Sequence, residues 1–158
     1  VAEYMSALAK KLASRKLERI ELMRDGEVVV ATIGSDNLFA PNDTVLRSSA
    51  GEFLKAYADL LRQVGMYRMV VVSHTDDTGS ESYTDHLSEA RAAAVSEWLS
   101  KDQIEGVTPL PYALGATDPL VPNDSRDNRA KNRRIEIYII PDRLIIEMAK
   151  SGMLKFKN

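Results

Sequence analysis

A charged residue interrupts the apolar face of one of the helices that this sequence predicts. Apolar side chains recur over residues 83–99 at helical spacing, and at about 100° per residue they form one stripe: Tyr83, Leu87, Ala90, Ala94, Val95 and Trp98. Arg91 falls in the middle of this stripe. A buried charge is costly unless it is paired and hydrogen-bonded, so the fold must give this arginine polar partners.

A candidate partner follows the most apolar segment of the chain. The run 69–72, Met-Val-Val-Val, is typical of a buried strand, and it leads into the polar segment 73–79, Ser-His-Thr-Asp-Asp-Thr-Gly. A strand therefore delivers the carboxylate of Asp76 at its C-terminal end, and the next helix delivers the guanidinium of Arg91. Two interpretations stay open at this point: the two groups neutralise each other as a structural ion pair, or together they hold a zwitterion.

The rest of the chain alternates predicted helices and strands. We expect helices over 2–16, 44–64 and 142–150, strands over 17–24, 27–33, 67–73, 108–114 and 134–140, a two-residue Asp-Gly hairpin turn at 25–26, and a polar loop over 116–127. The order favours an α/β (α+β) two-layer sandwich: a mixed four-stranded sheet with a βαβαβ core and helices packed on one face. The 158 residues fit a single domain, 1–158, with a core of about 27–140 and extra terminal helices over 1–16 and 142–152.

Composition excludes several classes of function. The net charge of −2 argues against a general nucleic-acid binder, and no apolar run approaches the roughly 20 residues of a membrane span. The chain has no cysteine, which excludes disulfides and thiolate chemistry and suits an oxidising compartment. Because it begins at Val1 rather than Met, we expect an excised fragment, with any contact to a membrane made by a region upstream.

Three motifs, in order along the chain, carry a family resemblance. They are His-Thr-Asp-Asp-Thr-Gly at 74–79, Leu-Ser-Glu-Ala-Arg-Ala-Ala-Ala-Val at 87–95, and Asn-Arg-Ala-Lys-Asn-Arg-Arg-Ile-Glu-Ile at 128–137. With these motifs the chain resembles the OmpA-like C-terminal domain, which is shared by outer-membrane OmpA proteins, peptidoglycan-associated lipoproteins and MotB-type flagellar stators. The resemblance covers about 27–140, most of the chain.

The resemblance implies non-covalent binding to cell-wall peptidoglycan through the diaminopimelate of the stem peptide. The family's aspartate, here Asp76, grips the ammonium of that residue, and its arginine, here Arg91, grips the carboxylate. The chemistry agrees, because an amino-acid zwitterion needs one anion and one planar cationic fork. We therefore expect a tether in the periplasm at the outer membrane, or at the inner membrane if the parent protein is stator-like, with no metal or cofactor.

The resemblance also extends the candidate site and shows where this chain departs from the family. It adds four candidate ligand-binding residues: Asn42, Thr78, Thr84 and Arg133. The chain carries Ser73, Asp77 and Thr84 where the family usually has Gly, Asn and Asn. These departures put affinity in question more than identity, and they leave room for an alternative in which the fold has no ligand and serves as an assembly or dimerisation platform.

An enzyme is the other alternative class. Ser88, His74 and Asp76 are the residue types of a hydrolytic triad. However, Ser88 is predicted on a helix rather than in a nucleophile elbow, and the sequence contains no Gly-x-Ser-x-Gly. His74 is more simply a hydrogen-bonding residue of the core or of a loop, and the nearby acidic residues follow no metal-ligand spacing.

Overall fold

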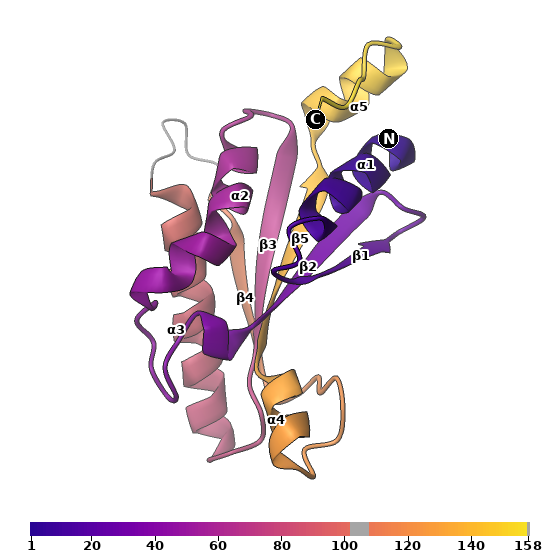
Figure 1. The fold of residues 1–158 in the computed structure, drawn as a ribbon. Coiled ribbons are helices and arrows are strands. Elements are labelled where there is room, and N and C mark those ends of the chain that lie inside the picture. Colours follow the sequence, from indigo (N-terminus) through magenta and orange to yellow (C-terminus); the bar gives the residue numbers. More distant parts are fainter. Residues whose placement is uncertain (102–107, 158) are drawn as a thin grey trace.

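A mixed sheet of five strands lies at the centre of the computed structural model, which describes residues 1–101 and 108–157 (Figure 1). In spatial order the strands are β1 (Arg19–Met23), β2 (Val28–Gly34), β5 (Arg134–Pro141), β3 (Tyr67–His74) and β4 (Leu110–Gly115). β3 and β4 run parallel, and the other neighbouring pairs are antiparallel. The predicted strands are confirmed, and β4 lies at the sheet edge, where its prolines do least harm to the ladder.

The sheet has five strands rather than the predicted four. β1 folds back on β2, with Met23 opposite Val28, and so joins the sheet at its edge. The turn between them spans 24–27 rather than two residues. Three of its residues have positive φ, namely Arg24, Asp25 and Gly26, and the glycine at φ 82° sits where a side chain would be strained.

Five α-helices accompany the sheet in the described residues. They are α1 (Ala2–Ala13), α2 (Gly51–Leu61), α3 (Glu81–Ser100), α4 (Arg126–Asn132) and α5 (Arg143–Lys150), with short 3₁₀ turns η1 (Ser35–Asn37) and η2 (Ser48–Ala50). The helix expected over 44–64 begins late because Leu46 forms a β-bridge with Phe39. The start of α4 lies inside the predicted loop, and the Ser125 hydroxyl caps it by accepting from the amide of Asn128.

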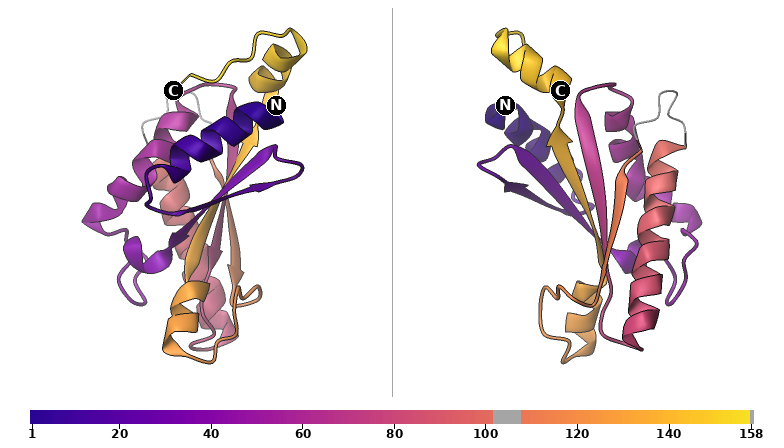
Figure 2. Two further views of the ribbon diagram at one scale, coloured as in Figure 1. Left: turned by 45° about the vertical axis from the view of Figure 1, so that its right-hand side comes forward. Right: turned by 180° about the vertical axis from the view of Figure 1, so that it is seen from behind.

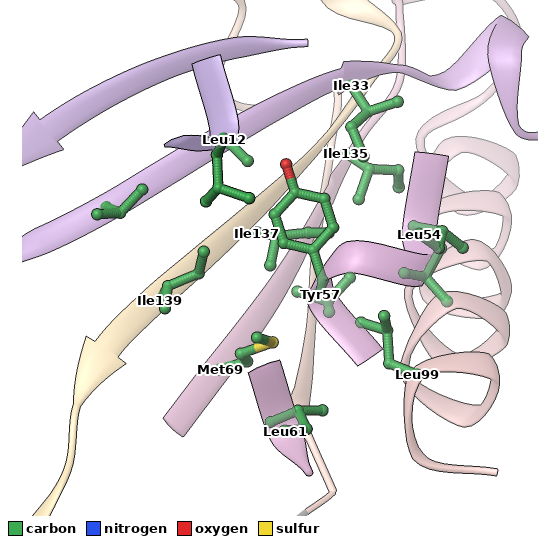
Figure 3. Close-up of a cluster of buried hydrophobic side chains, with 14 of the residues drawn as sticks. Leu12, Ile33, Leu54, Tyr57, Leu61, Met69, Leu99, Ile135, Ile137 and Ile139 are labelled. Carbon is green, nitrogen blue, oxygen red and sulfur yellow. The ribbon is translucent and has the colours of Figure 1, made fainter. Parts of the chain in front are cut away.

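One hydrophobic core lies between a single face of the sheet and the helices α1, α2 and α3, whose arrangement beside the strands can be followed in Figure 2. Alternate strand residues point into it, among them Val29, Ala31, Ile33, Met69, Val71, Ile135, Ile137 and Ile139. Tyr57 of α2 lies at the middle of this cluster, close to Ile137, and its hydroxyl donates to the Glu18 carboxylate (Figure 3). The prediction that the main helices share one face is confirmed.

The buried face of α3 differs from the predicted apolar stripe. Tyr83 and Ala90 are exposed, while the buried residues are Thr84, Ser88, Arg91, Ala92, Val95, Ser96 and Leu99. The reason is the close approach of α3 to the backbone at β4: the Ser88 hydroxyl accepts from the amide of Gly115 at 3.0 Å, and Ser96 donates to the carbonyl of Pro109. Small hydroxyl side chains fit this interface, and the predicted burial of Arg91 is confirmed.

No helix in the described part of the chain has the length and hydrophobicity needed to cross a bilayer.

Candidate functional site

A cavity of about 260 Å³ lies at the end of the sheet where β3 ends and β5 begins. The register pairs His74 with Arg134. The loop that follows β3 and the loop that precedes β5 therefore lie at the same end of the sheet. Figure 1 shows α4 and the first turns of α3 at this end. The cavity is lined by Asp36, Pro41, Asn42, Thr75, Asp76, Thr78, Tyr83, Leu87, Arg91 and Arg133.

Asp76 is held as a carboxylate by its neighbours. It is 8% exposed, its Oδ1 accepts from the amide of Thr78 at 2.8 Å, and its Oδ2 accepts from Arg133 Nη1 at 2.7 Å. Burial alone raises the pKa of Asp76, but the hydrogen bonds from Thr78 and Arg133 outweigh it, and the pKa lies below its ordinary value. The cavity therefore presents an anion at neutral pH.

Arg133 is paired with two carboxylates. Its Nε and Nη2 donate to the two oxygens of Asp36 at 3.1 and 2.9 Å, and its third contact is the bond to Asp76. The pair with Asp36 raises the pKa of Arg133 although partial burial opposes this. Such a bidentate arginine–carboxylate pair has fixed geometry and is stronger than a single hydrogen bond between neutral groups.

Arg91 is surrounded differently, because its partners are neutral. It is 2% exposed, its Nε donates to the carbonyl of Asp43 at 2.8 Å, and its Nη2 donates to the carbonyl of Ala40 at 3.2 Å. The guanidinium also lies over the Phe39 ring, 4.8 Å from the centroid. Burial lowers the pKa of Arg91, and nearby carboxylates, Asp36 first, oppose that shift; an arginine stays charged in either case.

The structural ion pair between Asp76 and Arg91, one of the two interpretations of the sequence, is therefore wrong. Asp76 pairs with Arg133, and Arg91 bonds to main-chain carbonyls of the loop that precedes α2. Both residues nevertheless line the same cavity. The second interpretation, in which the two charges hold a zwitterion, stays a prediction.

Asn42 and Tyr83 form another part of the cavity wall. The Tyr83 hydroxyl donates to Asn42 Oδ1 at 2.7 Å. Asn42 has φ 60°, in the left-handed region that asparagine tolerates better than most residues. Gly79 is required beneath Tyr83, since a Cβ at this glycine would lie 2.9 Å from the ring.

Five of the six predicted site residues line the cavity: Asn42, Asp76, Thr78, Arg91 and Arg133. Thr84 is not among the lining residues. It is buried in α3, and its hydroxyl donates to the carbonyl of Glu81. Its role in ligand binding stays a prediction.

Other residues that line the cavity were not predicted from the sequence. Tyr83 and Leu87 were placed in the apolar stripe of the helix, whereas Tyr83 is 40% exposed and borders the cavity. Asp36 gave no signal, because an acidic residue in the segment after the predicted strand 27–33 is ordinary. Only its pairing with Arg133, 97 positions along the chain, shows its place.

The OmpA family matches residues 38–133, more than half of the chain and nearly all of the cavity wall. The chain belongs to the OmpA family. The resemblance read from the three motifs is thereby confirmed.

Individual relatives agree with this assignment. Outer membrane protein A of Bordetella avium is 30% identical over 109 residues, which cover 69% of this chain and 56% of that protein. Peptidoglycan-binding protein ArfA of Mycobacterium tuberculosis is 32% identical over 109 residues, covering 69% of this chain and 33% of that protein. The chain spans less than two thirds of the length of these and other curated relatives, from 13% to 65%.

A solved structure shares the fold across most of both chains. The cell wall anchor of the T6SS from Pseudomonas aeruginosa superposes with a TM-score of 0.73 at 26% identity, covering 87% of this chain and 97% of that one. The α+β architecture is therefore the OmpA-like one.

The OmpA family is a family of binding domains rather than enzymes, and the geometry around the suggested triad agrees. Ser88 donates to the carbonyl of Asp85, and the Nε2 of His74 contacts the Glu136 carboxylate. Asp76 bonds to Thr78 and Arg133. The three triad candidates thus have separate partners, and the prediction that His74 is a hydrogen-bonding residue of the interior is confirmed.

Proposed function

We propose that this domain binds cell-wall peptidoglycan non-covalently by holding the diaminopimelate of the stem peptide. The ammonium of the free amino-acid end bonds to Asp76, and its carboxylate bonds to Arg91. Asn42, Thr78 and Arg133 shape the cavity around this end. The proposal draws support from the family, and from relatives that are called a peptidoglycan-binding protein and a cell wall anchor.

The observation that carries the proposal is the unequal pairing of the two arginines. Arg133 is neutralised by Asp36 and Asp76, whereas the hydrogen bonds of Arg91 to described residues go to two main-chain carbonyls and its guanidinium lies over a ring. The N–H groups of Arg91 beyond these two bonds have no partner among the described residues. An incoming carboxylate therefore gains most at Arg91, through charge-assisted hydrogen bonds that neutral partners cannot match.

The second half of the ligand follows from Asp76. An ionised carboxylate accepts several hydrogen bonds, and each oxygen of Asp76 already accepts one. An ammonium uses the lone pairs that remain. A peptide-bonded amino acid has neither a free ammonium nor a free carboxylate at its α-carbon, so this cavity selects a free amino-acid end.

The biological role that we infer is that of a tether. The domain attaches its parent protein to the wall in the periplasm, and a membrane anchor outside this chain holds the other end, at the outer membrane in the first instance. The match to an outer membrane protein supports this location. Each contact is modest, on the order of 1–3 kcal/mol, so binding is reversible and gains from the many identical sites on the wall.

The test of the function compares two kinds of insoluble sacculi. In one the third stem residue is diaminopimelate; in the other it is lysine, which keeps the side-chain ammonium but lacks the carboxylate beside it. We expect the domain to pellet with the first and to stay in solution with the second, because only the first provides a partner for Arg91. Equal pelleting with both kinds would contradict recognition of the amino-acid end.

An assembly platform without a ligand is the second candidate, and one observation favours it. The sheet face opposite the core carries a groove of about 510 Å³, lined in part by Met23, Val28, Val70, Tyr138, Ile140 and Ile146. A homodimer through this face without a ligand predicts that the wild type does not pellet with sacculi and that Val70→Glu lowers its sedimentation coefficient. If the sedimentation coefficient is the same for both proteins, the dimer is excluded.

A further inference from the structure

Asp36 does not bind the ligand in the proposed function, yet it makes the most extensive ion pair at the cavity. It supplies both of its carboxylate oxygens to Arg133, at 3.1 and 2.9 Å. Its main-chain carbonyl accepts from Arg47 Nε at 3.0 Å, which ties η1 to the loop before α2. The position of Asp36 is therefore fixed from both its side chain and its backbone.

The bond to Asp36 determines where the Arg133 guanidinium points. Nε and Nη2 form the edge that faces Asp36, and only Nη1 reaches Asp76. An arginine uses this edge to bind a carboxylate in bidentate geometry. As long as Asp36 occupies it, Arg133 cannot offer the same edge to a ligand.

The charges at the cavity consequently balance. Two carboxylates, Asp36 and Asp76, and two guanidiniums, Arg91 and Arg133, line it. Arg133 is shared between the two carboxylates, and within the described residues Arg91 hydrogen-bonds to neutral groups alone. A ligand end with one carboxylate and one ammonium keeps this balance, whereas an end with negative charge alone leaves Asp76 facing an anion.

We propose that Asp36 is a specificity-determining residue, which restricts the cavity to a zwitterionic end by occupying the Nε and Nη2 edge of Arg133. The inference rests on the proposed function and adds to it the residue that sets charge selectivity. Asp36 acts through Arg133 and is thus a positioning residue. Without its charge, the Nε and Nη2 edge of Arg133 becomes available, and the cavity gains one positive charge.

The test measures selectivity rather than affinity alone. Soluble meso-diaminopimelate and pimelate, the same seven-carbon diacid without amino groups, compete with diaminopimelate sacculi for the wild-type protein, for Asp36→Asn and for Asp77→Asn. The asparagine at position 36 is nearly isosteric and keeps one acceptor for Arg133. Asp77→Asn is the matched control, since it removes one negative charge from an exposed neighbour of Asp76.

We expect Asp36→Asn to lower the ratio of the pimelate to the diaminopimelate inhibition constant by about tenfold or more, as suits the loss of one charge close to the ligand. Asp77→Asn should leave this ratio near the wild-type value. Partial unfolding weakens both competitors alike, so it does not imitate a change in their ratio. An unchanged ratio in Asp36→Asn, with wild-type binding intact, would overturn the inference and spare the proposed function. If the wild-type protein binds neither sacculi nor meso-diaminopimelate, both fall.

Discussion

Arg133 Nη1 donates to Asp76 Oδ2 at 2.7 Å, so the aspartate after β3 is held by the arginine before β5 and not by the one on α3. Arg91 is left with main-chain carbonyls and the face of Phe39. The anion and the available cation of the cavity are therefore kept apart. A site in which Asp76 and Arg91 neutralised each other would have to break that pair before it bound a zwitterion.

Arg91→Lys tests whether the planar fork matters beyond its charge. A lysine ammonium cannot keep both carbonyl bonds and also hold a carboxylate through two parallel hydrogen bonds. We expect the affinity for meso-diaminopimelate, measured by calorimetry, to fall about tenfold or more, and the free energy of unfolding to fall by about 1–3 kcal/mol. Arg126→Lys, on the exposed start of α4, is the control and should change neither quantity. Wild-type affinity in Arg91→Lys would show that charge alone suffices.

The pH dependence of binding follows from Asp76. Its pKa lies below the ordinary value of 3.8 in the free protein, because the hydrogen bonds from Thr78 and Arg133 outweigh the effect of burial. A bound ammonium lowers this pKa further, so affinity is constant above it and falls about tenfold per pH unit below it. Titration with meso-diaminopimelate should give a flat affinity from pH 7 to about pH 4 and a decline below. A decline already between about pH 7 and pH 5 would mean that another group controls binding.

The same pKa shift affects folding stability, and its sign is fixed. Since the folded-state pKa of Asp76 is depressed, its ionic contacts contribute stability above the unfolded value near 3.8. That contribution is lost as the pH falls through the lower, folded-state value. Asp76→Asn should therefore flatten the acid limb of the stability curve measured by urea denaturation. An acid limb as steep in the variant as in the wild type would rule out Asp76 as its source.

Substitutions of Asn42 test how much its left-handed backbone conformation costs in stability. Alanine and glycine at this position both lose the bond from the Tyr83 hydroxyl, so a comparison of the two isolates the cost of φ 60°. We expect Asn42→Ala to be about 1 kcal/mol less stable than Asn42→Gly in chemical denaturation, because only glycine adopts this region freely. Equal stability of the two variants would mean that the loop relaxes.

Ser88→Ala separates stability from binding. The Ser88 hydroxyl accepts from the buried amide of Gly115, and alanine leaves that amide unpaired. The expected loss is about 1–3 kcal/mol of unfolding free energy, with no change in affinity for meso-diaminopimelate because Ser88 does not line the cavity. Ser82→Ala, on the exposed first turn of α3, should leave stability nearly unchanged. Weaker ligand binding by a folded Ser88→Ala would refute this separation.

The sequence predicted the strands well, because their signals are local. The alternation of Ile135, Ile137 and Ile139 defines one face of β5, and all three residues are buried in the core. The late start of α2 could not be read in this way. It depends on the bridge between Phe39 and Leu46, which forms only when the loop folds against the rest of the protein.

The sequence predicted those site residues that belong to the family's motifs. Asp76, Arg91 and Arg133 lie within the motifs that the family shares, and all three line the cavity. The pairing among them was not predictable, since the sequence shows which charges are present but not which carboxylate reaches which guanidinium. The buried face of α3 was misjudged for a similar reason: Thr84 and Ser96 face inward because the backbone at β4 lies close, and hydropathy does not report that approach.

The measurement that tests the central claim most directly is co-sedimentation of the purified domain with diaminopimelate sacculi, comparing the wild type with Asp76→Ala and Arg91→Ala. Circular dichroism first establishes that each variant is folded, and Asp77→Ala serves as the control. The wild type and the control should pellet with the sacculi, while Asp76→Ala and Arg91→Ala stay in solution. Pelleting of all four folded proteins to the same extent would contradict the account, because it would make Asp76 and Arg91 structural residues only.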